Sequence, residues 1–202
     1  MMTASFKRWW GGVFLLALVW LSVGMVVGGL HTGAAETTQT LMTTYTTAGI
    51  NQQFTDLDKA MFTWVNNLVL AVVLLVLAIV ASRYLAACLL FIQMLSIGIV
   101  FGGHMVDYGI FPVVMYILPH GLMEIGIYSY LVAFGAQIDK NAATFIETMS
   151  SIYIVKKLHA TFKLVRTHLV TLDHVILALL LLAFAAYIEV FVSPWVLLAC
   201  LG

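Results

Sequence analysis

Charged residues are scarce in this sequence: only 9% of its 202 residues are Asp, Glu, Lys or Arg, against about 25% in an average soluble domain. Such a chain lacks the polar surface that a soluble fold presents to water, and its 63% hydrophobic content also excludes a disordered coil. The nine basic and nine acidic residues cancel, and the missing basic excess argues against nucleic acid as a partner. The class that remains is a multi-pass membrane protein.

Cysteine is equally scarce, and several catalytic motifs are missing. Cys88 and Cys200 lie in apolar runs without metal-binding or redox spacing, so we expect buried thiols rather than a disulfide. The sequence has no GxSxG or GxxxxGK pattern, which removes support for serine-hydrolase and phosphate-loop chemistry. An HExxH helix is also absent.

Apolar runs long enough to cross a bilayer recur along the chain. They predict five transmembrane helices, over residues 10–30, 62–81, 85–101, 119–138 and 175–199. Residues 31–61 read as a polar loop, residues 102–118 as a short interfacial or re-entrant helix, and Pro119 as the first turn of the fourth span. The expected fold class is therefore an all-α polytopic membrane protein with a single integral membrane domain.

Basic residues set the expected orientation in the membrane. With a cytoplasmic N-terminus, eight of the nine basic residues lie on the cytoplasmic side and only Lys59 lies outside. The opposite orientation places one inside and eight outside. We therefore expect a cytoplasmic-membrane protein with its C-terminus on the extracytoplasmic side, and with residues 31–61 and 102–118 facing outward.

Residues 139–174 carry most of the remaining charge together with an apolar stripe at helical spacing. Apolar residues such as Phe145, Met149 and Ile152 recur at steps of three and four, beside Lys156 and Lys157. This pattern predicts a cytoplasmic amphipathic helix at the interface or under the bundle, which offers a docking surface for partners.

Two small-residue spacings allow helices to approach closely: Gly24 with Gly28 in the first span, and Gly98 with Gly102 in the third. Such pairs pack either within one chain or at the seam of a homodimer. We favour packing within the chain.

Two acids lie inside predicted spans, where an ionisable group is costly and marks a candidate site. With a rise of about 1.5 Å per residue, Glu124 lies about 7 Å and Glu189 about 9 Å below the external surface, so both carboxylates occupy the outer half of the bilayer. His120 lies four residues before Glu124 and shares its helical face. Further polar side chains are expected at or just above this level: Asn66, Asn67, His104 and Asp107.

Three interpretations fit this arrangement. In the first, His120, Glu124 and Glu189 are catalytic residues that bind a divalent metal such as zinc, supported by His104 or Asp107, and activate water for hydrolysis. In the second, they form the proton or ion relay of a transporter. In the third they are structural, and hydrogen bonds between them tie the helices together.

Two segments resemble the motifs of a known family. Residues 118–124 read LPHGLME and residues 185–194 read AAYIEVFVSP. Together with Asn66-Asn67 and the glycines at 98 and 102, in this order, they resemble the stage II sporulation protein M family. Gly126 departs from the pattern, because many members carry proline at this position.

The resemblance implies an all-helical integral membrane protein in which Glu124 and Glu189 belong to recurrent motifs. The sporulation member is similar to a scaffold that holds peptidoglycan-degrading enzymes at a septal membrane, and relatives accompany gene sets for circular bacteriocins. The implied partners are cell-wall hydrolases, a precursor peptide or an ATP-binding transport subunit. We therefore expect a scaffold, assembly or export and maturation factor. The alternatives are a metal-dependent intramembrane peptidase or cyclase and an ion-coupled transporter.

Overall fold

The computed structural model describes residues 4–31, 55–146 and 170–201, and these are helical with no strand among them. The elements are α1 (Ala4–Leu30), α3 (Asp56–Val80), α4 (Arg83–Tyr108), α5 (Ile110–Ile146), α7 (Val170–Tyr187), the π-helical turn η1 (Ile188–Val192) and α8 (Ser193–Leu201). Within these described ranges, five stretches are long and apolar enough to cross a membrane: Phe6–Leu30, Asp56–Val80, Arg83–Tyr108, Ile110–Ile138 and Val175–Leu201. The predicted all-α fold with five spans is thereby confirmed.

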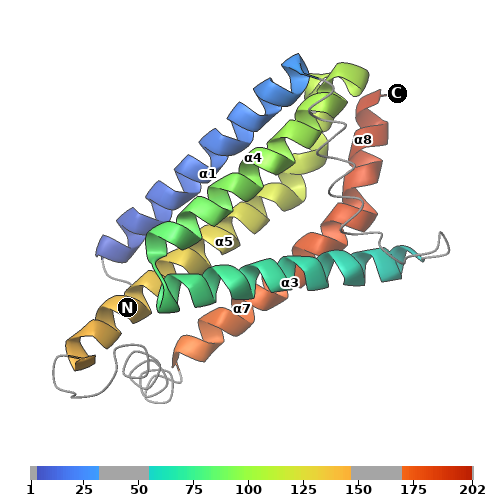
Figure 1. The fold of residues 1–202 in the computed structure, drawn as a ribbon. Helices are drawn as coiled ribbons and strands as arrows, with labels where there is room; N and C mark the ends of the chain where they lie inside the picture. The colour runs from blue at the N-terminus through green and yellow to red at the C-terminus, as the bar shows by residue number, and fades with distance from the viewer. Residues whose placement is uncertain (1–3, 32–54, 147–169, 202) are drawn as a thin grey trace.

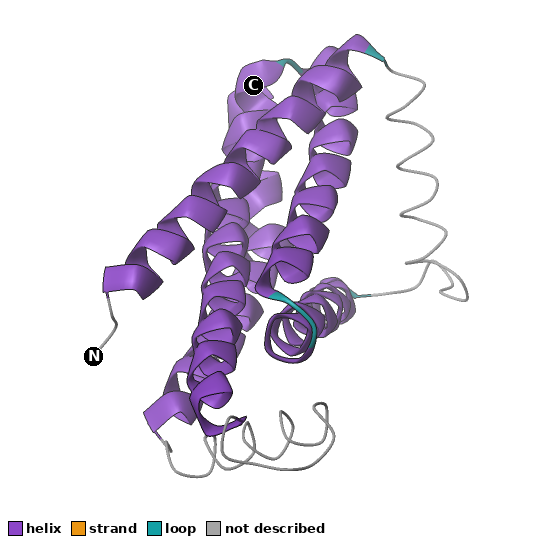
Figure 2. Ribbon diagram, turned by 60° about the vertical axis from the view of Figure 1, so that its left-hand side comes forward, coloured by secondary structure: helices purple, strands orange, loops and turns teal. Residues whose placement is uncertain are grey.

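The helices pack around α5, which contacts every other described element. Helices α1, α4 and α5 run along the long axis of the molecule, and α3 crosses them steeply (Figure 1). The second view shows α3 nearly end-on while its neighbours run up the page (Figure 2). Helix α7, η1 and α8 form one continuous path that ends near the turn between α4 and α5 (Figure 1).

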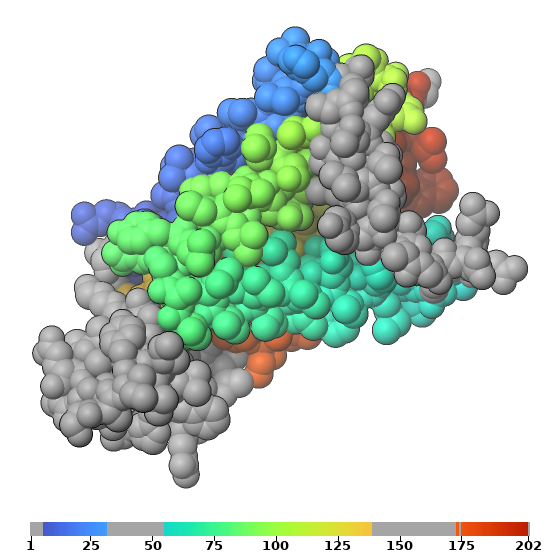
Figure 3. Space-filling view, viewed as in Figure 1, coloured from blue at the N-terminus to red at the C-terminus, as the bar shows by residue number. Residues whose placement is uncertain are grey.

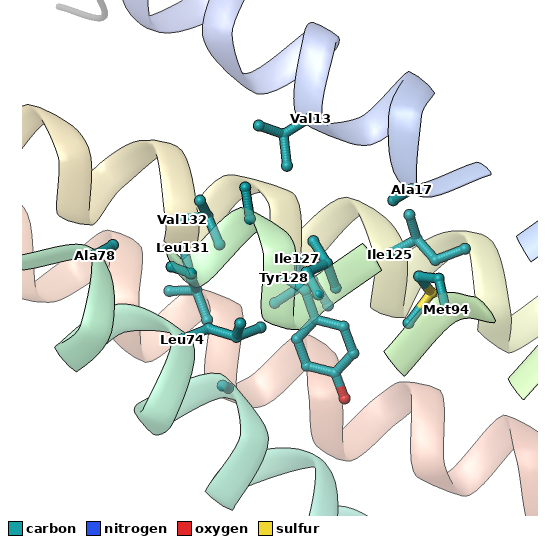
Figure 4. Packing of buried hydrophobic residues seen from close by; sticks show 14 of the residues in the cluster. Val13, Ala17, Leu74, Ala78, Met94, Ile125, Ile127, Tyr128, Leu131 and Val132 are labelled. Atoms are coloured by element: carbon teal, nitrogen blue, oxygen red, sulfur yellow. The ribbon is translucent and has the colours of Figure 1, made fainter. Parts of the chain in front are cut away.

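The core is formed by small and branched apolar side chains from several helices (Figure 4). Tyr128 and Leu131 of α5 lie against Leu74 of α3, Leu90 of α4 and Leu182 of α7, all at most 1% exposed. Many large apolar side chains remain exposed on the helices, and α1, α4 and α3 lie next to one another on the face seen in Figure 3. An apolar exterior of this kind is the surface that a membrane protein presents to lipid.

The stretch 102–118, predicted as a separate short helix, is divided between α4 and α5 instead. Helix α4 continues to Tyr108 and α5 begins at Ile110. The single residue between them, Gly109, has φ of 88°, a conformation that favours glycine. Pro119 lies inside α5 rather than in its first turn. Gly109 therefore marks a helix end, whereas Pro119 does not.

The last span contains a π-helical turn that the sequence analysis missed. Within η1 the chain widens, so that the backbone N–H of Ser193 donates to the carbonyl of Ile188, five residues earlier. Pro194 follows directly and has no N–H to continue an α-helical ladder. A π-turn adds a residue to one turn and rotates the side chains around it, and such turns are frequent at functional sites. Glu189 lies in this turn and Ser193 directly after it.

The glycine pairs of α1 and α4 pack against each other, which confirms the prediction of packing within the chain. A Cβ at Gly24 would collide with the carbonyl of Leu95, and one at Gly28 with the carbonyl of Ile99. In return, a Cβ at Gly98 or Gly102 would collide with carbonyl oxygens of α1. Because facing residue numbers rise together, the two helices run parallel. Their glycine faces are occupied by this contact and give no support to a dimer seam.

Other predicted segments lie only partly within the residues that the structure describes, or differ from it in detail. Helix α3 begins at Asp56, earlier than the predicted span, because the Thr55 hydroxyl accepts from the Asp58 N–H and the Thr55 N–H donates back to the Asp58 carboxylate. Residues 32–54 of the polar loop and 147–169 of the amphipathic helix lie outside the described residues. Both cysteines are free, but Cys88 is exposed on the outer face of α4, so its expected burial is wrong.

Replacing Gly28 with alanine should destabilise the protein, since its Cβ would meet backbone atoms of α4 that cannot move aside. Overpacking of this kind costs about 1–3 kcal/mol. Gly12→Ala is the matched control, because a Cβ there meets nothing within 4 Å. Thermal midpoints of the purified variants in detergent measure the difference, and equal midpoints would contradict the backbone contact.

Candidate functional site

A hydrogen bond between Asn67 and Glu124 joins α3 to α5 inside the membrane-spanning region. The Asn67 Nδ2 donates to Glu124 Oε1 at 2.5 Å, across 57 residues of sequence. Both side chains are partly buried. In a bilayer the carboxyl group has few other donors, so this bond fixes where α3 crosses α5.

A second polar pair joins α5 to α8 one helical turn away from Glu124. His120 Nδ1 and Ser193 Oγ lie 3.0 Å apart and share a hydrogen bond. The two side chains are 4% and 0% exposed. The ring of Tyr116 packs edge-on against the imidazole, with centroids 5.6 Å apart. Ser193 reaches this position because η1 immediately precedes it.

Glu189 approaches the same region from η1. Its side chain is partly buried, and it lies within electrostatic range of Glu124 and of the phenol groups of Tyr116 and Tyr128. Two carboxyl groups from segments more than sixty residues apart therefore lie within electrostatic range of one another. We call the set Asn67, Tyr116, His120, Glu124, Tyr128, Glu189 and Ser193 the polar cluster.

Tyr128, Tyr116 and Ser193 were missed by the sequence analysis. Tyr128 is 1% exposed, its hydroxyl has no hydrogen-bond partner among the described residues, and it lies in range of both carboxylates. A signal was present, because Tyr116, His120, Glu124 and Tyr128 follow each other at intervals of four and so share one face of α5. The site prediction rests on acids, histidines and asparagines alone, so it leaves out the tyrosines of this stripe.

Three of the predicted supporting residues do not join the polar cluster. Asn66 is exposed on α3, although its neighbour Asn67 faces Glu124. His104 is partly exposed near the end of α4, where its ring lies 6.2 Å from that of Tyr108, and Asp107 is exposed. In the described part of the chain, neither His104 nor Asp107 hydrogen-bonds to a member of the cluster.

The family of the chain follows from a match that covers nearly all of it. A family model described as Stage II sporulation protein M matches residues 13–194. The chain belongs to the stage II sporulation protein M family. The match includes the segments 118–124 and 185–194, so the polar cluster of this family member lies within the matched region. No curated protein and no solved structure matches the chain.

The predicted metal ligands of this family member are not gathered around one point. Among residues 4–31, 55–146 and 170–201, no group of three His, Cys, Asp or Glu side chains lies close enough to hold a metal ion. His120 Nδ1 is hydrogen-bonded to Ser193, and one carboxyl oxygen of Glu124 accepts a hydrogen bond from Asn67. The arrangement supplies paired hydrogen bonds between helices and two neighbouring carboxyl groups.

The adjacent asparagines give a matched test of the cluster in this stage II sporulation protein M family member. Asn67→Leu removes the donor to Glu124 and should lower the free energy of unfolding by about 1–2 kcal/mol. Asn66→Leu changes an exposed side chain and should cost far less. Unfolding in mixed micelles measures both variants, and an equal loss would contradict the pairing.

Proposed function

We propose that this chain is a non-enzymatic membrane component that acts through partner proteins, as a scaffold, assembly or export and maturation factor. The observation that supports this proposal is the internal pairing of the polar cluster. Asn67 binds Glu124 and His120 binds Ser193, so these groups join α3, α5 and α8 instead of facing an open reaction centre. Polar pairs of this kind hold membrane helices in place.

The exposed face of α3 is the proposed contact for a partner helix. Phe62, Asn66, Val69 and Val73 share this face at helical spacing, and all four side chains are exposed. An amide on an apolar membrane surface favours association, because another helix can supply the hydrogen bond that lipid cannot. The partner classes implied by the family resemblance are a cell-wall hydrolase, a precursor peptide or an ATP-binding transport subunit.

The proposed orientation places the start of α1 on the cytoplasmic side. Lys7 and Arg8 begin α1 and Arg83 begins α4, and these two helix starts lie at the same end of the molecule (Figure 1). Lys59 lies in the first turn of α3, which runs in the opposite direction to α4. An excess of cations on the cytoplasmic side is the usual arrangement in membrane proteins.

Replacing Glu124 with glutamine distinguishes a structural role of this side chain from a role in acid–base chemistry. Glu124→Gln keeps an oxygen that accepts from Asn67, so partner binding should be retained, whereas Glu124→Leu removes the acceptor and should weaken it. A photo-crosslinking residue at position 66 reports partner binding in native membranes, with exposed Ile176 of α7 as the control position.

The expected result is a discrete crosslinked product at position 66 that persists with Glu124→Gln and falls with Glu124→Leu. Products of equal yield at position 176, or none at position 66, would contradict a specific contact on α3. Loss of partner binding with Glu124→Gln would contradict a structural role for the carboxyl group.

A second candidate function, proton coupling in a transporter, is favoured by the closeness of the carboxylates. Glu124 and Glu189 lie within electrostatic range of each other and of Tyr128, and neighbouring acids of this kind serve as proton relays in membrane transporters. If the chain carries protons, Glu189→Gln abolishes proton uptake into liposomes containing the protein, and Asn66→Leu leaves it unchanged. Equal uptake with and without Glu189 would exclude this candidate.

A further inference from the structure

An apolar groove of about 340 Å³ lies between α1, α5 and α7. Trp10 of α1 forms one wall, Leu177 and Leu181 of α7 form the other, and Met123 and Gly126 of α5 form the floor. These residues belong to three of the five candidate membrane spans. The groove is separate from the polar cluster, and none of its lining residues is a cluster member.

Gly126 shapes the floor of this groove. Because glycine has no side chain, the backbone of Gly126 can be reached by the indole of α1. The Gly126 carbonyl accepts a hydrogen bond from Trp10 Nε1 at 3.2 Å. This bond pairs the indole N–H of the wall with the backbone of the floor, and most of the other lining side chains are apolar. The nearest neighbour of a Cβ at this position is the Phe14 ring, 4.0 Å away, so a larger side chain would project into space beside α1.

The environment of the groove decides what fills it. A dry apolar groove at the depth of membrane spans is not a site for water, which needs polar partners. The surrounding medium is lipid, and an acyl chain matches both the shape and the chemistry of the lining. A flexible hydrocarbon chain can follow the groove along α5 from Tyr130 to Leu122, which line its length.

The charges at one end of the groove indicate the headgroup. Lys7 lies three residues before Trp10 on the same face of α1, Arg8 follows it, and both are exposed. Asp173, also exposed, lies four residues before Leu177 on α7 and carries the opposite charge. Arg83 lies at the same end of the molecule, but its guanidinium stacks over Trp9 and Tyr84 at the contact between α1 and α4. Among the described residues, a salt bridge joins Lys59 to Asp56. Lys7 and Arg8 form no salt bridge with a described acidic residue, so both can bind an anionic group.

We propose that this groove binds an acyl chain of an anionic phospholipid, whose phosphate lies at Lys7 and Arg8. Phosphate is a strong acceptor for arginine and lysine, and basic residues at the end of a membrane helix attract anionic lipid. The lipid lies along the seam between α1 and α7 and completes the packing of both helices on α5. This assignment does not depend on the proposed function.

Native mass spectrometry of the full-length chain tests the site, with phosphatidylglycerol and phosphatidylcholine of identical acyl chains added in equal amounts. The wild-type protein should retain one phosphatidylglycerol with a preference of about tenfold, from two cations near the headgroup. Lys7→Gln with Arg8→Gln should bind both lipids equally, because the groove is intact and the charges are gone. Lys59→Gln, at the opposite end of the molecule, is the matched control and should keep the preference.

Two further variants separate the headgroup from the groove. Asp173→Asn removes the opposing charge and should increase the preference for phosphatidylglycerol. Gly126→Leu fills the groove and should reduce retention of both lipids, provided that its thermal midpoint shows a folded protein. The proposal is overturned if wild-type protein retains both lipids equally, if the Lys7 and Arg8 variant keeps the preference, or if Lys59→Gln loses as much.

Discussion

The hydrogen bond from Asn67 to Glu124 is the constraint on which the arrangement of the polar cluster depends. A carboxyl group inside a bilayer needs a donor from the protein, and α3 supplies it only where it crosses α5. That crossing sets the steep course of α3 across its neighbours (Figure 2). The same contact leaves Asn66 on the outside, because adjacent residues of a helix point in directions about 100° apart.

A second constraint acts at the far side of α5. His120 is almost completely buried, and its hydroxyl partner Ser193 is brought to it by the π-turn η1. The two polar pairs hold α3 and α8 against one stripe of α5. Helices α1 and α4 meet differently, through glycine faces and backbone atoms. The bundle therefore combines close backbone packing on one side with specific hydrogen bonds on the other.

The elements with strong periodic or compositional signals could be predicted from the sequence. The five spans follow from the length of the apolar runs, and close packing within the chain follows from the spacing of Gly24, Gly28, Gly98 and Gly102, although the spacing did not identify α4 as the partner of α1. His120, Glu124 and Glu189 are candidate site residues because ionisable groups are rare in such runs, and the structure places the two acids within electrostatic range of each other.

The features that were missed depend on three-dimensional packing. Pro119 lies inside α5 because neighbouring apolar residues continue the helix across it, whereas sequence reasoning treats proline as a boundary. No local pattern distinguishes Asn66 from Asn67, since only the azimuth of α3 decides which of them faces Glu124. Ser193 joins the cluster through a π-turn, and a change of helical register cannot be read from residue types. The buried hydroxyl of Tyr128 looked apolar in the sequence.

The parallel contact between α1 and α4 has a consequence for how the chain is made. Two neighbouring helices that cross a membrane in the same direction require the chain to return between them, which α3 does. Helix α1 leaves the ribosome before α4 has been made, so it cannot pack against α4 until α3 and α4 have both been inserted. Until then the glycine face of α1 contacts lipid or the insertion machinery. The close backbone contact between α1 and α4 therefore forms only after the intervening helix has been inserted.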